Sequence, residues 1–226
     1  MAMQLYAHEL ATTSRAVLAL LEALHLEHRG LDVEVITVDL MRGEHHAPEY
    51  VAINPNRLIP ALTDGEFVLT EASAILRFLA SEAGSPLYPE DLRSRARVDE
   101  RMAWFEANLY KDLGFQLVYT RLFPHHSRGS EAADAATCQW GREKTKQWLT
   151  VLNDHWIDED GWVAGSQLTI ADFFAASILS LAELIDFELG EYPKLYAWYR
   201  RVLRQEAWAR TNTAYSEWVG RMKEAA

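Results

Sequence analysis

Apolar residues in the first third of the chain alternate between the spacing of strands and the spacing of helices. Residues 3–6 predict a short strand, and residues 31–40 are rich in β-favouring side chains. Residues 14–27 predict a helix between them, because apolar side chains fall on one helical face. These side chains are Val17, Leu18, Leu20, Leu21 and Leu24. Residues 47–53 predict a further, short helical turn.

The next segment carries a strong local signal for a β-hairpin. Two short apolar runs, residues 59–62 and 67–69, flank the pair Asp64-Gly65, which favours the positive φ angles of a tight turn. Thr70 then precedes a run with the helical period, with apolar residues at Ala72, Ile75, Leu76 and Leu79. The order strand, helix, strand, hairpin and helix predicts a thioredoxin-like α/β domain with four strands.

Beyond Asp91 the strand signals nearly vanish and helical patterns replace them. Apolar residues recur at spacings of three or four from Val98 to Leu113, which predicts a long amphipathic helix. A second long helix is expected over residues 131–156. Thr169 and Asp172 have the spacing of a capping box before an apolar helix, and Pro193 is placed to open another. The second part of the chain is therefore predicted to be all-helical.

Residues that stop helices separate these two parts. Gly84-Ser85-Pro86 and Pro89 follow the last helix of the α/β part. We expect a thioredoxin-like domain over residues 1–83, a linker over residues 84–92 and an all-helical domain over residues 93–226.

The composition narrows the classes of partner. The 226 residues carry a net charge of −11, which argues against nucleic acid or an anionic membrane as the main partner. No apolar run approaches the roughly 20 residues of a membrane span, and no signal peptide is apparent. The lone Cys138 excludes an intramolecular disulfide and fits a reducing compartment. We therefore expect a soluble cytoplasmic protein.

Metal and dithiol chemistry find no support in the sequence. No group of His, Cys, Asp and Glu has the spacing of a metal site, and His125-His126 is interpreted as part of a solvated loop. A Cys-x-x-Cys pair is also absent, which excludes thioredoxin-type redox chemistry.

The hairpin segment also carries a candidate binding site. Pro60 opens a strand, and a cis Ile59–Pro60 bond would turn the backbone groups of Ile59 outward, toward a peptide-like ligand. A few residues later, the start of the helix at Glu71 offers free N–H groups to an anion. Backbone able to pair with a peptide, next to an anion site, suits a small acidic peptide.

This arrangement of strand, proline, hairpin and Glu-helix resembles the glutathione-binding site of cytosolic glutathione transferases, most closely the theta-like bacterial members. The resemblance implies a thioredoxin-like domain followed by a helical domain, glutathione as co-substrate without a metal, and a homodimer. In that reading Glu71 neutralises the ammonium group of glutathione, while the amides of Ala72 and Ser73 bind the adjacent carboxylate. The backbone of Ile59 pairs with the cysteinyl unit. His45 and His46 lie where theta-like members place residues that hold the glycyl carboxylate, and Arg57 would add positive charge nearby.

Each of these residues has an alternative interpretation without a ligand. Glu71 is also what a helix N-terminus favours on electrostatic grounds alone. His45 is also compatible with an ordinary surface histidine.

The sequence departs from the family's pattern at the residue that matters most for catalysis. Theta-like enzymes carry a Ser four residues before an Arg, and its hydroxyl stabilises the thiolate of glutathione. In this chain Ala11 holds that position before Arg15. Thr12 is the best substitute by register and Ser14 the next, although either could be a plain helix N-cap. The family's Glu-Ser pair is also replaced, by Glu71-Ala72, which removes one hydroxyl contact to the ligand.

Two functions follow as alternatives. The first is a glutathione transferase that activates the thiol for attack on a small apolar electrophile. Its second pocket would be lined by Trp104, Phe105, Tyr110 and Tyr119, for which core packing is the alternative. The second function is a non-catalytic glutathione-binding or scaffold protein on the same fold, because Ala11 and Ala72 are what a relict site would contain.

Overall fold

The computed structural model describes residues 2–224 and contains the predicted four-stranded sheet. Its strands are β1 (Met3–Ala7), β2 (Val33–Thr37), β3 (Ala61–Asp64) and β4 (Phe67–Thr70), in the order β2-β1-β3-β4. β1 runs parallel to β2 and antiparallel to β3, and β3 pairs with β4 across the hairpin turn at Gly65, where φ is +60°. The prediction of a thioredoxin-like first part is confirmed.

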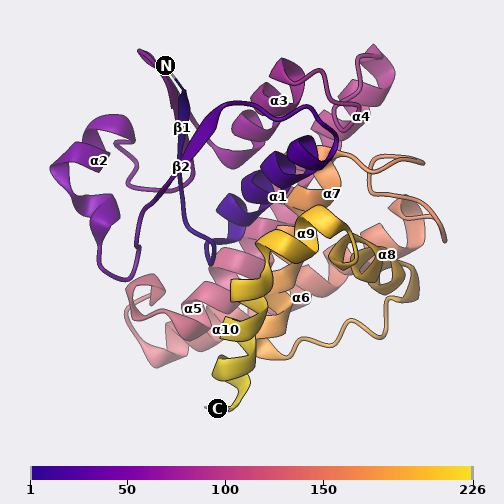
Figure 1. The fold of residues 1–226 in the computed structure, drawn as a ribbon. Coiled ribbons are helices and arrows are strands. Elements are labelled where there is room, and N and C mark those ends of the chain that lie inside the picture. Colours follow the sequence, from indigo (N-terminus) through magenta and orange to yellow (C-terminus); the bar gives the residue numbers. More distant parts are fainter. Residues whose placement is uncertain (1, 225–226) are drawn as a thin grey trace.

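Helices of this part flank the sheet as the sequence predicts. They are α1 (Thr12–Leu26), the 3-10 turn η1 (Glu44–His46), α2 (Pro48–Ile53) and α3 (Ala72–Glu82). Figure 1 shows α1 between the sheet and the helices of the second part, whereas α2 stands apart on the other side. α1 begins at Thr12, two residues before the predicted start, so both Thr12 and Thr13 lie in its first turn.

The second part is helical throughout its regular structure. α4 (Leu92–Trp104), the π-helical η2 (Phe105–Tyr119) and α5 (Thr120–Leu122) follow each other as one long helix, and the 3-10 turn η3 (Pro124–His126) comes next. α6 (Glu131–Val151) continues into the π-helical η4 (Leu152–Trp156). The remaining elements are α7 (Ile170–Leu179), the 3-10 segment η5 (Ser180–Ile185), α8 (Pro193–Leu203), α9 (Glu206–Thr211) and α10 (Thr213–Glu224). The predicted long helices are confirmed, but the wider π turns were not predicted.

The capping box before α7 is present and fully buried. The carboxylate of Asp172 accepts hydrogen bonds from the backbone N–H of Thr169 (2.8 Å), from that of Val163 (2.9 Å) and from the indole N–H of Trp198 (2.8 Å). Asp172 therefore fixes the start of α7, the loop before it and the middle of α8 at one point.

A buried arginine ties α1 to the C-terminal helices. The guanidinium of Arg15 donates to Asn212 Oδ1 (2.8 Å), to Ser180 Oγ (2.6 Å) and to the carbonyl of Ser177 (3.2 Å). Its central carbon lies 3.5 Å from the centre of the Tyr215 ring. Arg15 has no exposed surface, so these contacts hold the first turn of α1 against the helical part.

Gly141 marks a close approach between α6 and η2, and its replacement is a test of the packing. A methyl group there would lie 2.9 Å from the Asp112 carbonyl and 3.0 Å from the Leu117 backbone nitrogen. We expect Gly141→Ala to lower the free energy of unfolding by about 1–3 kcal/mol. Urea denaturation measures this loss. The matched control is Gly220→Ala in α10, where a methyl group meets open space and helix propensity favours alanine by about 0.5–1 kcal/mol. Equal effects of the two substitutions would contradict the close approach.

Residues 2–224 offer neither a membrane-spanning helix nor a metal-binding cluster. None of the helices there is both long and apolar enough to cross a membrane. Within the same residues, no cluster of His, Cys, Asp and Glu side chains could hold a metal ion.

Candidate active site

The start of α3 presents free hydrogen-bond donors beside a strained glutamate. Glu71 has a φ of +67° and an exposed side chain. Its carbonyl accepts the N–H groups of Ala74 and Ile75, both at 3.0 Å. No side chain in the described part of the chain caps this helix, and its first turn holds no acid. The N–H groups of Ala72 and Ser73 are therefore available to an anion.

The backbone of Glu71 is unusual for a residue with a side chain. A positive φ outside glycine costs on the order of 1–3 kcal/mol and persists where the surrounding structure demands it. Here it places a carboxylate next to two unpaired helix-start amides. That arrangement can bind an ammonium group and a carboxylate carried on one carbon atom.

The first turn of α1 holds three hydroxyl groups, and each has different surroundings. The Ile59–Pro60 peptide bond is cis, as the sequence reading required. Thr13 Oγ1 lies 3.5 Å from the Ile59 carbonyl, and Thr12 Oγ1 lies 2.8 Å from the hydroxyl of Tyr119. Ser14 is fully buried, and its hydroxyl finds no hydrogen-bond partner among residues 2–224.

The turn η1 contributes a histidine with an unused nitrogen. His45 Nδ1 is buried and lacks a partner within the described residues. Burial, followed by the charges of His46 and His125, lowers the pKa of His45 below its usual 6.5. The His45 and His46 rings are 3.9 Å apart between centres, and His46 is exposed. Arg57, with a φ of +58°, is also exposed. An anion reaching His45 would supply the acceptor that Nδ1 lacks.

Only part of the predicted electrophile pocket comes together with these residues. Tyr110 and Tyr119 both belong to η2, and their hydroxyls lie 3.1 Å apart, next to Thr12. Phe105 is fully buried, and Trp104 packs on Trp148 and Trp156 within the helical part. For Trp104 and Phe105 these contacts support core packing, which the sequence left open as the alternative to a pocket role. Sequence reasoning also missed Phe115 and His126, whose rings contact Tyr119.

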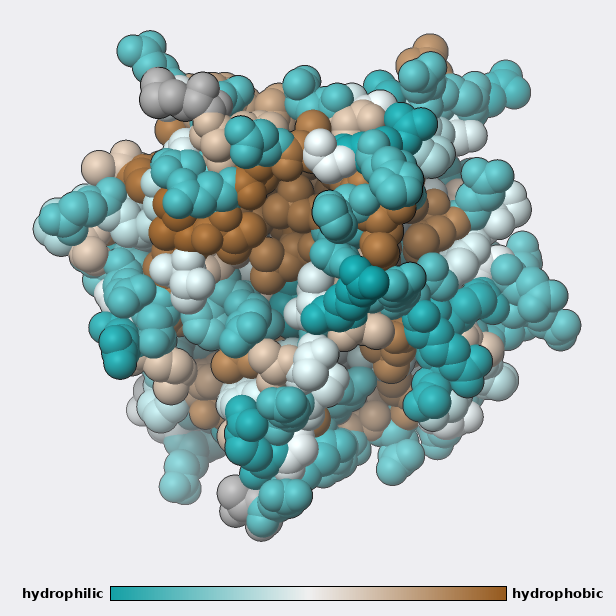
Figure 2. Space-filling model, in the orientation of Figure 1, coloured by the Kyte–Doolittle hydropathy of each residue, from teal (hydrophilic) through white to brown (hydrophobic). Residues whose placement is uncertain are grey.

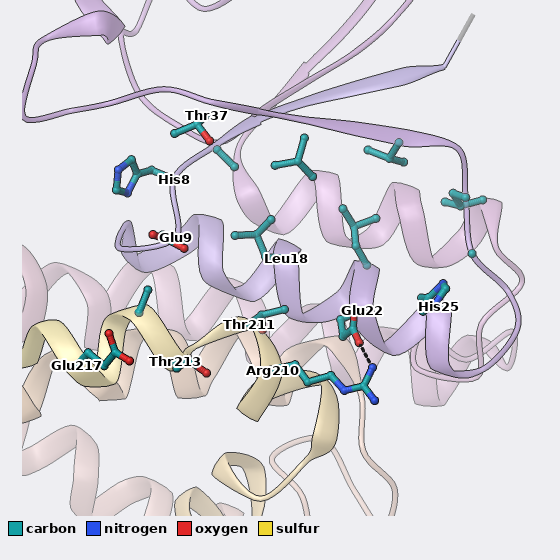
Figure 3. A pocket seen from close by; sticks show the side chains of 17 residues that line it. His8, Glu9, Leu18, Glu22, His25, Thr37, Arg210, Thr211, Thr213 and Glu217 are labelled. Atoms are coloured by element: carbon teal, nitrogen blue, oxygen red, sulfur yellow. Dashed lines mark hydrogen bonds and ion pairs between the residues drawn. The ribbon is translucent and has the colours of Figure 1, made fainter.

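A separate hollow of about 770 Å³ lies between β2, α1 and the last two helices. Figure 3 shows its lining, with Arg210 directed at Glu22, to which it donates at 2.7 Å. Its lining includes the apolar side chains of Leu18 and Val35. Figure 2 shows apolar, brown surface over β2 and α1. The hollow contains none of the predicted site residues. Because its carboxylates include Glu9, Glu22 and Glu217, it offers a poor environment for an acidic peptide.

Comparison with known families gives both parts of the chain the same assignment. Residues 1–81 match the family description "Glutathione S-transferase, N-terminal domain", and residues 110–206 match "Glutathione S-transferase, C-terminal domain". The chain belongs to the glutathione S-transferase family.

Theta-class glutathione S-transferases are among its relatives. The chain is 32% identical to glutathione S-transferase theta-2 of Homo sapiens over 205 residues, which cover 89% of this chain and 81% of that protein. It is also 32% identical to glutathione S-transferase D7 of Drosophila melanogaster over 201 residues, covering 88% and 83%.

Solved structures of glutathione transferases have the same fold as this chain. The structure of human glutathione transferase theta-2, in complex with glutathione and an unknown ligand, has a TM-score of 0.81 at 29% identity and covers 100% of this chain and 92% of that one. A diazinon-metabolizing glutathione S-transferase of the silkworm Bombyx mori has a TM-score of 0.76 at 31% identity, covering 96% and 98%. The theta-like glutathione S-transferase assignment is confirmed, and the bacterial type stays a prediction.

Proposed function

We propose that this protein is an active glutathione S-transferase that ionises the thiol of glutathione for attack on a small apolar electrophile. The observation that carries the proposal is Glu71, held at a positive φ beside the uncapped start of α3. A scaffold has no physical need for this strained arrangement.

Each functional group of glutathione has a counterpart in the site. The carboxylate of Glu71 would bind the ammonium group, and the N–H groups of Ala72 and Ser73 would bind the neighbouring carboxylate. The backbone of Ile59 would pair with the cysteinyl unit. The unpartnered Nδ1 of His45 supports a contact with the glycyl carboxylate, to which the exposed side chains of His46 and Arg57 add donors.

Catalysis requires preferential stabilisation of the thiolate. A free thiol has a pKa of about 8.5, so only a few per cent is ionised at neutral pH. We assign the stabilising hydroxyl to Thr12, which lies in the first turn of α1, where the helix dipole also favours a negative charge. The complete burial of Ser14 counts against it, and we give it a packing role.

The electrophile site, the domain boundaries and the homodimer are proposed from the positions of residues and from the family to which the chain belongs. The electrophile would meet the faces of Tyr110 and Tyr119. The division into residues 1–83, a linker at 84–92 and residues 93–226 agrees with the absence of helix or strand between α3 and α4. A homodimer in the cytoplasm, with no role for nucleic acid or membrane, completes the proposal.

Two measurements test this function and its alternative. Titration calorimetry should detect binding of glutathione, and a generic aromatic electrophile should be conjugated by the wild-type protein but much more slowly by Thr12→Ala. Ala11 favours the alternative of a non-catalytic glutathione-binding protein. Binding without any turnover would establish that alternative, and an absence of binding would refute both and leave only a scaffold on the same fold.

A further inference from the structure

Three hydroxyl groups form a continuous chain across the junction of the two parts of the molecule. Thr12 Oγ1 lies 2.8 Å from Tyr119 Oη, and Tyr119 Oη lies 3.1 Å from Tyr110 Oη. Thr12 belongs to α1, whereas both tyrosines belong to η2, 107 residues away in the case of Tyr119.

Proton counting limits what this chain of hydroxyls can do. Each hydroxyl carries one proton, so three protons serve two hydrogen bonds and one proton remains free to reach another acceptor. A phenol is a stronger donor than an aliphatic alcohol, because its pKa is about 10 and that of the alcohol is far higher. The favoured order is therefore Tyr110 to Tyr119 to Thr12, in which the proton of Thr12 serves neither of these two hydrogen bonds.

We propose that Tyr119 is a positioning residue for Thr12. Tyr119, which accepts a hydrogen bond from Tyr110, donates one to Thr12 Oγ1, so that the proton of Thr12 points to the thiolate of glutathione. This inference rests on the proposed function, and it deepens that function by naming what replaces the serine hydroxyl missing at Ala11. The thiol of glutathione loses its proton to water, and Thr12 Oγ1 then donates a hydrogen bond to the sulfur. No proton moves along the chain of hydroxyls. Each hydrogen bond in the chain polarises the next hydroxyl group and makes it a stronger donor.

The surroundings of Tyr119 support a donor role. Burial raises the pKa of Tyr119 above its usual 10, and burial likewise raises that of Tyr110, so both phenols keep their protons at neutral pH. The hydrogen bonds with Thr12 and Tyr110 oppose the rise in the pKa of Tyr119, and so does the charge of Arg15, which is buried on α1. Its positive charge strengthens Tyr119 as a donor without ionising it. The His126 ring packs 5.2 Å from the ring of Tyr119, and Phe115 packs at the same distance, so the phenol is held in place.

The thiol pKa of bound glutathione tests the proposal directly. It is measured by titrating the ultraviolet absorbance of the thiolate on saturated protein. Thr12→Ala should raise it by about one to two units, the value of a hydrogen bond to a charged group. Tyr119→Phe keeps the ring and should raise it by roughly half a unit. Thr12→Ser should restore the wild-type pKa, and Tyr196→Phe, an exposed tyrosine on α8, is the matched control without effect.

The double variant separates positioning from direct contact. If Tyr119 acts through Thr12, then Tyr119→Phe adds nothing in the Thr12→Ala background. A further rise there would show that Tyr119 touches the sulfur itself, and an unchanged pKa in Tyr119→Phe alone or in Thr12→Ala alone would also overturn the proposal. Calorimetry distinguishes these outcomes from failure of the proposed function: wild-type protein that binds no glutathione refutes the function, and the positioning role with it.

Discussion

Replacing Asp172 with alanine is expected to lower the free energy of unfolding by about 3–5 kcal/mol, as when one partner of a buried charged network is removed. The carboxylate has no exposed surface, and it accepts hydrogen bonds from Val163, Thr169 and Trp198. Its loss leaves these buried donors unpaired, each at a cost of about 1–3 kcal/mol. Urea denaturation of the two proteins measures the difference.

The control for this prediction is Asp91→Ala. Asp91 also caps a helix, α4, by accepting from the Ser94 N–H at 2.9 Å, but it is exposed. Water can replace a lost hydrogen bond at an exposed cap, so this variant should lose far less stability than Asp172→Ala. Equal losses would show that burial of the capping box contributes nothing.

Asp172 also gives the protein a specific dependence on pH. Burial raises the pKa of its carboxyl group from 3.8 to about 6, while the donated hydrogen bonds oppose the rise. The folded state thus binds a proton more tightly than the unfolded state. The stability that Asp172 adds relative to Asp172→Asn, which does not titrate, should be greatest below about pH 4 and decrease as the pH rises through 6. A difference that grows over this interval would contradict the raised pKa.

Replacing Glu71 with glutamine is expected to weaken glutathione binding by about 10- to 100-fold, because a hydrogen-bonded pair between two charged groups becomes a neutral contact. The glutamine is of similar size and keeps the helix start. Calorimetry measures the change in affinity. Glu66→Gln is the matched control, since Glu66 is an exposed glutamate in the turn between β3 and β4, a few residues before Glu71. It should bind glutathione as the wild type does.

A second substitution separates the charge of Glu71 from its backbone. Glycine adopts a positive φ without strain, so Glu71→Gly should fold at least as stably as the wild type while losing affinity for glutathione. Thermal unfolding and calorimetry on the same sample would show these opposite effects. Loss of both stability and affinity would mean that Glu71 has only a structural role.

Local chemistry explains which features the sequence predicted well. The hairpin follows from Asp64-Gly65, and the cap of α7 follows from Thr169 and Asp172, because each signal needs only residues a few positions apart. The start of α3 was predicted one residue early in the same way, at Glu71 instead of Ala72. The resemblance to glutathione transferases then indicated that the segment around Glu71 binds glutathione, which its periodicity alone could not indicate.

Contacts between distant parts of the chain were beyond the sequence. No pattern near Thr12 indicates that its partner is Tyr119, since the bond depends on how α1 packs against η2. Similarly, no local pattern indicates that Trp104 packs on Trp148 and Trp156 of the second long helix, or that Phe105 is fully buried. The burial of Ser14 likewise depends on the packing of α1 against the rest of the fold.

A crystal structure of the protein with bound glutathione tests the central claim most directly. The account predicts the ammonium group against Glu71, the adjacent carboxylate on the N–H groups of Ala72 and Ser73, and the sulfur within hydrogen-bond distance of Thr12 Oγ1. Glutathione seated between β2 and α1, or a sulfur whose nearest donor lies on another residue, would contradict it.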